Sequence, residues 1–143
     1  MSGSATSRIS HRFYASAAWA RLAIPRVVAD RPRALYLDAD VVALADVARL
    51  FDADLEGQPI GAVVDAWHGH LGRSMKLGPH LPELGAAPTA PYVNTGVLLM
   101  DLDAFRRERI ADACLDLVGR YPLRYADQDA INVVLAGRAR LLD

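Results

Sequence analysis

Residues 34–42, with the sequence ALYLDADVV, constrain the fold of this chain more than any other segment. A short apolar run ends in two carboxylates, Asp38 and Asp40. On a regular strand these side chains would point to opposite faces, so they converge only where the strand ends and the chain turns. Ligands of α/β sheets bind beyond the carboxyl ends of strands, and carboxylates suit Mg²⁺ or Mn²⁺. The run predicts a divalent metal site; the alternative is one helix cap and one solvated aspartate.

The composition predicts one globular domain without a nucleic-acid partner. The 143 residues are 52% hydrophobic and 23% charged, and the net charge is −1, which excludes binding of nucleic acid through bulk charge. Cys114 is the single cysteine and favours a reducing compartment. Residues 1–10 read as a flexible lead-in without the apolar core of a signal peptide. We therefore expect a cytoplasmic protein.

Strands and helices alternate along the predicted order of elements. The expected strands are 34–37, 60–67, 97–102 and 139–142. The expected helices are 14–28, 46–51, one begun by an Asp103 cap and stopped by Pro122, and one from an Asp127 cap to about 136. Pro25 is expected to interrupt the first helix or to begin a second one. The Gly-, Pro- and His-rich residues 68–91 read as a long loop. This order predicts a mixed or mostly parallel α/β sheet flanked by helices.

Further polar side chains fall at the ends of these elements. Asp65 ends one strand, Asn94 and Thr95 precede another, and Asp127 and Gln128 begin a helix. Each has a simpler explanation as a solvated carboxylate, a turn or a cap. Together they predict an active site of the kind that α/β proteins build at element ends.

Five segments, in this order and spacing, carry a resemblance to a known family: ISHRFYASAAWARLAIPRVV, ALYLDADVV, GAVVDA, YVNTGVLLMDLDAFR and YADQDAINVV. They resemble the retaining nucleotide-sugar glycosyltransferases of family 8, which include lipopolysaccharide glucosyl- and galactosyltransferases and glycogenin. The resemblance implies a GT-A-like fold, with a partial catalytic domain over residues 11–143. It also implies UDP-glucose or UDP-galactose as donor and a saccharide or glycolipid acceptor. Any membrane association would be peripheral, through the acceptor.

The resemblance assigns the metal and donor positions first. Asp38, Ala39 and Asp40 match the family's metal motif, which would hold Mn²⁺ or Mg²⁺ against the donor diphosphate. Arg21 matches an arginine that contacts the donor. A guanidinium suits a diphosphate, although a solvated helix arginine is the alternative.

The sugar-binding positions come from the later segments. Asp65 matches an aspartate near the donor sugar, and Asn94 and Thr95 match the lining of the sugar pocket. Asp127 matches the aspartate that binds sugar hydroxyls, and Gln128 matches the glutamine nearest the anomeric carbon. Because a neutral amide is a poor nucleophile, these positions favour same-face attack by the acceptor with retention of configuration.

The chain departs from the family pattern at both ends. The strand and helix that would cradle the nucleotide are missing before residue 14, and no histidine metal ligand follows the last strand. We therefore expect a chain truncated at both ends. The alternative function is an inactive remnant that acts as an interaction domain or needs a partner chain.

Two further alternatives concern other chemistry. Trp67 and the loop histidines His68, His70 and His80 could hold a transition metal, although contact with an acceptor sugar is the preferred interpretation of that loop. A phosphohydrolase of the haloacid dehalogenase type also uses an Asp-x-Asp triplet. It needs a later lysine, and the sole lysine, Lys76, lies in the loop.

Overall fold

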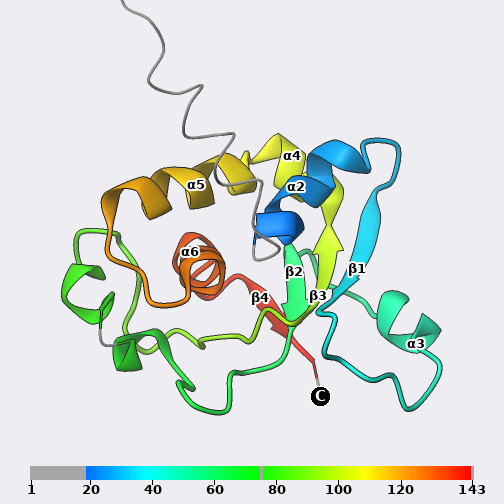
Figure 1. Cartoon of the computed structure of the whole chain (residues 1–143), viewed down its shortest axis with the longest axis horizontal. Helices are drawn as coiled ribbons and strands as arrows, with labels where there is room; N and C mark the ends of the chain where they lie inside the picture. Colours follow the sequence, from blue (N-terminus) through cyan, green and yellow to red (C-terminus); the bar gives the residue numbers. More distant parts are fainter. Residues whose placement is uncertain (1–18, 75, 143) are drawn as a thin grey trace, which may run out of the picture.

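The computed structural model describes residues 19–74 and 76–142 as a four-stranded sheet with helices on both sides (Figure 1). The strands are β1 (Arg33–Leu37), β2 (Ile60–Ala62), β3 (Val97–Asp101) and β4 (Ala139–Leu141). The helices are α2 (Ala20–Val27), α3 (Ala48–Phe51), α4 (Leu102–Arg107), α5 (Ile110–Arg120) and α6 (Ala126–Val134). The expected lead-in and the first residues of the expected helix 14–28 lie outside the described residues.

The sheet is mixed, with the strand order β1-β3-β2-β4. Strand β3 lies inside the sheet because its residues Leu98, Leu99 and Met100 are fully buried. It pairs antiparallel with both β1 and β2, while β2 and β4 are parallel. Antiparallel pairing therefore predominates among the described strands, where a mostly parallel sheet was one expectation. The crossover through α4, α5 and α6 brings β4 back beside β2.

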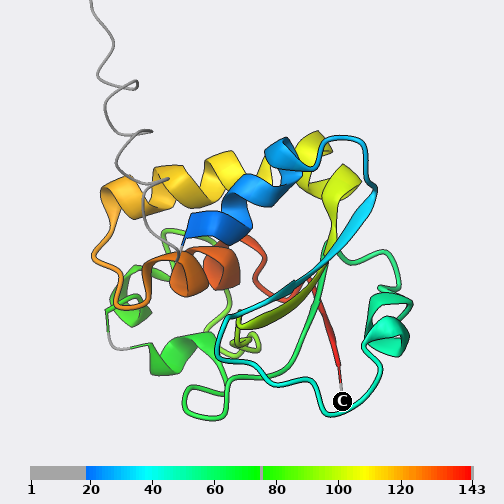
Figure 2. The same ribbon diagram turned by 45° about the vertical axis from the view of Figure 1, so that its right-hand side comes forward.

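Helices cover the two faces unequally. Helices α2, α4, α5 and α6 pack over one face, and the short α3 lies on the other (Figure 2). The core between the sheet and the larger helical layer is apolar, and its largest fully buried members include Leu22, Leu98, Met100, Leu102, Phe105 and Ile131. This layer fixes the amino-terminal ends of α2 and α6 relative to the strand ends.

The expectations for the helix ends at Pro25 and Asp103 are wrong. Helix α2 continues through Pro25 to Val27, although an interior proline removes one hydrogen bond and crowds the preceding turn, and Pro25 is buried. The cap of α4 is Asp101, whose carboxylate accepts from the Ala104 N–H at 2.9 Å, rather than Asp103. Arg109 then has a left-handed backbone with φ of 54°, so a separate helix α5 begins at Ile110.

The loop 68–91 is confirmed as a loop, but it is firmly anchored. It contains two short 3-10 turns, η2 (Leu71–Arg73) and η3 (Gly78–His80). Leu71, Leu77 and Leu81 are fully buried in the core. The side chains at the start of the loop are therefore held in fixed positions near the sheet. In the part of the chain that the structure describes, no helix is long and apolar enough to cross a membrane.

Candidate active site

A buried arginine from α2 joins three separate elements. Arg21 is 6% exposed. Its Nη2 lies 2.9 Å from Oδ1 of Asp38, just beyond β1, and its Nη1 donates to the carbonyl oxygen of Thr95 at 2.7 Å, before β3. Its Nε lies 3.0 Å from Oδ2 of Asp127 in α6, too oblique for a hydrogen bond, so this contact is an ion pair. The alternative of a solvated helix arginine is wrong.

Asp38 lies where β1 ends, as the sequence predicts. The Tyr36 hydroxyl donates to Oδ1 of Asp38 at 2.6 Å, and the Arg21 guanidinium lies 4.7 Å from the Tyr36 ring centroid. Burial, with this hydrogen bond to Asp38, raises the pKa of Tyr36, so the phenol remains a donor. A Cβ at Gly96 would lie 3.0 Å from Oδ2 of Asp38, so the close approach of the two segments requires glycine there. Asp40 is exposed.

Asp65 follows β2 and is held by the start of the long loop. Its Oδ1 accepts from the Trp67 N–H at 3.0 Å and from both the N–H and Nδ1 of His68 at 2.9 Å. Its Oδ2 faces the amides of Asn94 and Gln128, each at 3.4 Å. Burial opposes ionisation, but the hydrogen bonds from His68, Trp67 and Asn94 outweigh it and lower the pKa of Asp65. The carboxylate is therefore ionised at neutral pH.

Asp127 and Gln128 occupy the first turn of α6, where the helix dipole favours negative charge. Asp127 is not the expected helix cap, because its carboxylate pairs with Arg21 and the cap position is Tyr125. Burial raises the pKa of Asp127, and the charge of Arg21 opposes the shift. Gln128 Oε1 accepts from the Thr95 N–H at 3.0 Å, which leaves its Nε2 directed toward Asp65.

The predicted site residues therefore converge, with two exceptions. Contacts join the following predicted residues into one cluster: Arg21, Asp38, Asp65, Asn94, Thr95, Asp127 and Gln128. Ala39 and Asp40 are exposed and make no recorded side-chain contact with the other described residues. Asp40 is therefore free to bind something from solvent.

Several further residues, not predicted from the sequence, hold this cluster together. Tyr36 lies two residues before Asp38, so period-two alternation puts both on one face of β1. Asn132 lies one helical turn after Gln128 and exchanges hydrogen bonds with the N–H and carbonyl oxygen of Val93 at 2.6 and 2.8 Å. Both spacings could have been recognised in the sequence. The contact of Asp129 with the Tyr92 hydroxyl, at 2.6 Å, joins distant segments that local spacing does not connect.

The loop histidines do not form the alternative transition-metal site. His68 binds Asp65, His70 Nδ1 lies 3.0 Å from the Pro88 carbonyl oxygen, and His80 pairs with Glu83 at 2.8 Å. Among residues 19–74 and 76–142, no three His, Cys, Asp or Glu side chains are grouped to hold a metal.

The donors at the end of β1 nevertheless fit a hard divalent cation. Oδ1 of Asp38 is occupied by Arg21 and Tyr36, whereas Oδ2 receives no hydrogen bond from the described residues. Asp40 offers a second carboxylate in solvent. Mg²⁺ and similar ions bind through one or two carboxylates together with substrate phosphates and water, so two protein carboxylates are sufficient for this kind of site.

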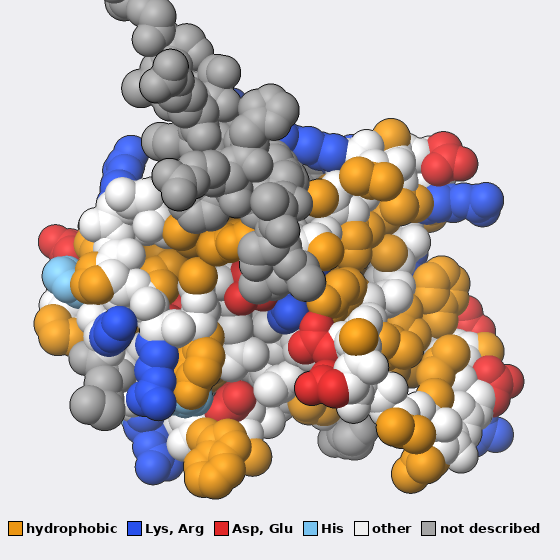
Figure 3. Space-filling model, viewed as in Figure 1, with side chains coloured by type: hydrophobic (Ala, Val, Ile, Leu, Met, Phe, Trp, Pro, Cys, Tyr) orange, Lys and Arg blue, Asp and Glu red, His pale blue; other side chains and the backbone are white. Residues whose placement is uncertain are grey.

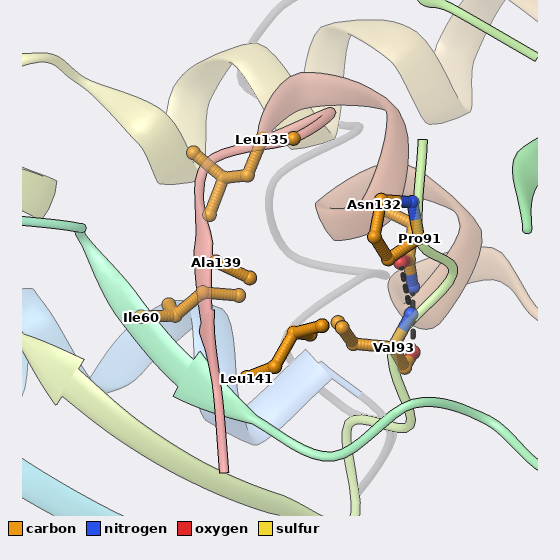
Figure 4. A pocket seen from close by; sticks show the side chains of 8 residues that line it. Ile60, Pro91, Val93, Asn132, Leu135, Ala139 and Leu141 are labelled. Atoms are coloured by element: carbon orange, nitrogen blue, oxygen red, sulfur yellow. Dashed lines mark hydrogen bonds between the residues drawn. The ribbon is translucent and has the colours of Figure 1, made fainter. Parts of the chain in front are cut away.

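A pocket lies on the other side of Asn132 and Val93 from this cluster, against β2, β4 and the carboxyl end of α6 (Figure 4). It has a volume of about 90 Å³ and its lining is mostly apolar: Ile60, Pro91, Val93, Asn132, Leu135, Gly137, Ala139 and Leu141. No charged side chain lines it, and the Asn132 amide is already bonded to Val93. It lacks the groups that would bind a diphosphate or activate a sugar.

Comparison with known proteins decides the family. The model of glycosyl transferase family 8 matches residues 4–143. The chain belongs to glycosyltransferase family 8. Its curated relatives include general stress protein A of Bacillus subtilis, 30% identical over 83% of this chain, and the lipopolysaccharide 1,2-glucosyltransferase of Escherichia coli, 31% identical over 77%. The resemblance seen in the sequence is thus confirmed for this family-8 chain.

Solved structures agree on a GT-A fold. The galactosyltransferase LgtC, in complex with donor and acceptor sugar analogs, is 31% identical, has a TM-score of 0.70 and covers 87% of the chain. The bifunctional glycosyltransferase WbbM has a TM-score of 0.74 at 23% identity, and this similarity supports the fold alone. This chain spans 41% of the B. subtilis protein, 31% of the E. coli enzyme and 44% of the LgtC chain.

Proposed function

We propose that this family-8 chain transfers a glucosyl or galactosyl group from a UDP-sugar to a saccharide or glycolipid acceptor, with retention of configuration. The observation that carries the proposal is the convergence of Asp38, Asp127 and Thr95 on the buried Arg21. Two relatives named as lipopolysaccharide hexosyltransferases support glucose or galactose and a lipopolysaccharide-type acceptor. A cytoplasmic reaction belongs to the same proposal and is supported by the free thiol of Cys114.

In this proposal Asp38 and Asp40 hold Mn²⁺ or Mg²⁺. The bound ion would act as a Lewis acid that neutralises charge on the departing diphosphate. Asp38 would bind through Oδ2, because Arg21 and Tyr36 occupy Oδ1. The three nitrogens of the Arg21 guanidinium contact Asp38, Thr95 and Asp127. We therefore assign Arg21 first the positioning of these residues, and only then a direct contact with the donor.

The remaining residues would bind and orient the sugar. Asp127 would accept hydrogen bonds from sugar hydroxyls, and Asn94 and Thr95 would line the sugar pocket. Asp65, ionised because its hydrogen bonds lower its pKa, would accept a further hydroxyl near the donor sugar. Each of these contacts fixes the direction from which the acceptor reaches the anomeric carbon.

Retention would come from same-face attack beside Gln128. Its Oε1 accepts from the N–H and hydroxyl of Thr95, so the amide Nε2 would face the sugar and Asp65. An amide nitrogen in that position is a poor nucleophile, and the acceptor hydroxyl would attack as the leaving phosphate oxygen takes its proton. A glycosyl group trapped on Asp127 or Asp129, detected by mass spectrometry, would instead establish a covalent intermediate.

The deciding experiment measures UDP release from UDP-glucose and UDP-galactose with Mn²⁺. We expect release that stops on chelation and falls at least about 100-fold in Asp38→Asn and Asp40→Asn, because a lost charge stabiliser of this type is worth roughly 10²–10³ in rate. Asp52→Asn is the matched control, an exposed aspartate beyond α3. Absence of both turnover and UDP binding would favour the alternative of an interaction domain.

A further inference from the structure

Unpaired positive charge is concentrated on one part of the surface. Most described arginines lie within 4.0 Å of a carboxylate, as Arg138 does with Glu108 at 2.7 Å. Five exposed cations have no such partner among residues 19–74 and 76–142. Arg49 lies apart on α3, whereas the other four lie on two segments, and we call them the cationic cluster: Arg73, Lys76, Arg120 and Arg124. Although the net charge of the whole chain is −1, the four positive charges of the cluster are not paired with carboxylates of the described residues.

The two segments that carry the cluster lie against each other. The ring of His80, in the loop, is 5.2 Å from the ring of Tyr121, between α5 and α6, and His68 is 5.7 Å from Tyr125. Lys and Arg side chains gather over the loop and the α5–α6 connection, to the left of the central Asp and Glu side chains (Figure 3). Two nearby carboxylates belong to these segments: Glu83, which pairs with His80, and Asp116, one turn before Arg120 on α5. A third, the buried Asp129 of α6, accepts from the backbone N–H groups of Arg124 and Tyr125 at 2.8 and 2.9 Å.

The cluster also borders the candidate active site through aromatic residues. Arg124 packs over the ring of Tyr125, 5.3 Å from its centroid, and Tyr125 directly precedes the first turn of α6. His68 is bonded to Asp65, and its neighbour Trp67 is 85% exposed. Flat aromatic surfaces of this kind suit the apolar faces of sugar rings. The order of groups from the site outward is thus Asp65, then aromatic rings, then unpaired cations.

We propose that the cationic cluster binds a phosphate or carboxylate group on the acceptor saccharide, so that the acceptor is an anionic sugar. This inference rests on the proposed function. Arginine forks bind such groups through paired hydrogen bonds, and cations at the rim of a cleft attract anionic substrates. We favour an anionic sugar over a membrane surface because the charges adjoin the aromatic residues of the site rather than an apolar insertion surface.

Glucose 6-phosphate, glucose and inorganic phosphate are the probes, added to the full chain without donor or metal. Trp67 reports binding by fluorescence, because the other tryptophan, Trp19, is buried. We expect glucose 6-phosphate to bind at least about tenfold more tightly than either glucose or phosphate, since several exposed charge pairs together are worth roughly one such factor.

The triple variant Arg73→Gln, Lys76→Gln, Arg124→Gln tests the assignment. Its affinity for glucose 6-phosphate should fall about tenfold, while its affinity for glucose stays unchanged. The triple variant Arg31→Gln, Arg49→Gln, Arg107→Gln changes net charge equally at exposed positions outside the cluster and should bind as the parent does. Equal binding of glucose and glucose 6-phosphate, or equal loss in both triple variants, overturns the proposal.

Two further measurements distinguish this proposal from a membrane-binding surface and from the proposed function itself. If vesicles containing phosphatidylglycerol bind the parent but not the cluster variant, while sugar binding is unaffected, the cluster is a membrane surface and the proposal is wrong. If UDP release in the parent is normal but glucose 6-phosphate binds no better than glucose, the acceptor inference fails alone. If glucose 6-phosphate binds as expected and no donor is turned over, the proposed function fails and the anionic-sugar site remains.

Discussion

Arg21 is a buried charge whose partners come from three elements. Its side chain is 8% exposed, and that of Asp127 is 11% exposed. A buried ion pair is not by itself a source of stability, because both charges have lost their hydration. Its cost is offset here because the guanidinium also binds Asp38 and the Thr95 carbonyl oxygen. The arginine therefore contributes most by fixing where three functional side chains lie.

Replacing Arg21 by methionine should destabilise the protein by about 3 kcal/mol, because it leaves a buried carboxylate without a partner. The measurement is the free energy of unfolding in urea. Arg107→Met, at a 67% exposed side chain, is the control and should change stability by less than about 0.5 kcal/mol. Similar changes in the free energy of unfolding for both variants would mean that Arg21 does not stabilise the contacts among the three elements.

Asp65 and Asp127 should give opposite pH dependences of stability. The folded pKa of Asp65 lies below its ordinary value of 3.8, so its contribution is complete above that pH and is lost as the pH falls through the folded pKa. The folded pKa of Asp127 lies above 3.8, so its contribution is complete below that pH and is lost as the pH rises through the folded pKa.

The corresponding measurement is the free energy of unfolding of Asp65→Asn and Asp127→Asn between about pH 2 and pH 6. Relative to the parent, Asp65→Asn should lose less stability on acidification and Asp127→Asn should lose more. Asp52→Asn, an exposed aspartate, should follow the parent curve. Slopes that change in the same direction for both variants would contradict the environments described for these carboxylates.

At the scale of elements, Asn132 joins α6 to the segment before β3. Replacing it by alanine leaves the N–H and carbonyl oxygen of Val93, which is 2% exposed, without partners and should cost about 2–3 kcal/mol. Amide hydrogen exchange should accelerate more at Val93 than at Leu99, inside β3. Equal acceleration at both amides would mean that the molecule opens globally and that Asn132 has no local role.

The sequence predicted elements more reliably than their ends and pairings. The apolar runs located all four strands, because burial on a sheet requires such residues, but β2 ends at Ala62 rather than at the expected residue 67. The break at Arg109 was missed because its left-handed backbone leaves no mark in an apolar period of 3.6. Strand direction was also beyond local reasoning, since an antiparallel β3 depends on how the chain crosses the sheet. At the site, the predicted ends of elements located Asp38 and Gln128, and the family resemblance suggested their roles. The ion pair between Arg21 and Asp127 joins residues too distant in sequence to be inferred from local patterns.

At the scale of the whole molecule, β1 is an edge strand next to an exposed apolar surface. Among the strands of residues 19–74 and 76–142, it pairs only with β3. The exposed apolar surface near it consists of Leu37, Val41, Val42, Leu44, Val47 and Phe51, and apolar side chains are prominent on that side of the molecule (Figure 3). An open strand edge beside apolar side chains favours association. The near-zero net charge of −1 gives little repulsion to oppose it.

The double variant Val42→Glu, Leu44→Glu should reduce self-association, measured by sedimentation velocity over a concentration series near the pI of 6.4. Because these side chains are 77% and 94% exposed, their replacement should change the free energy of unfolding by less than about 0.5 kcal/mol each. Val27→Glu is the control: Val27 is 79% exposed on α2, in the helical layer on the other face of the sheet. If Val27→Glu suppresses association as strongly per added charge, net charge rather than the β1 surface drives it. If only the double variant does so, the molecules associate through the exposed apolar surface beside β1.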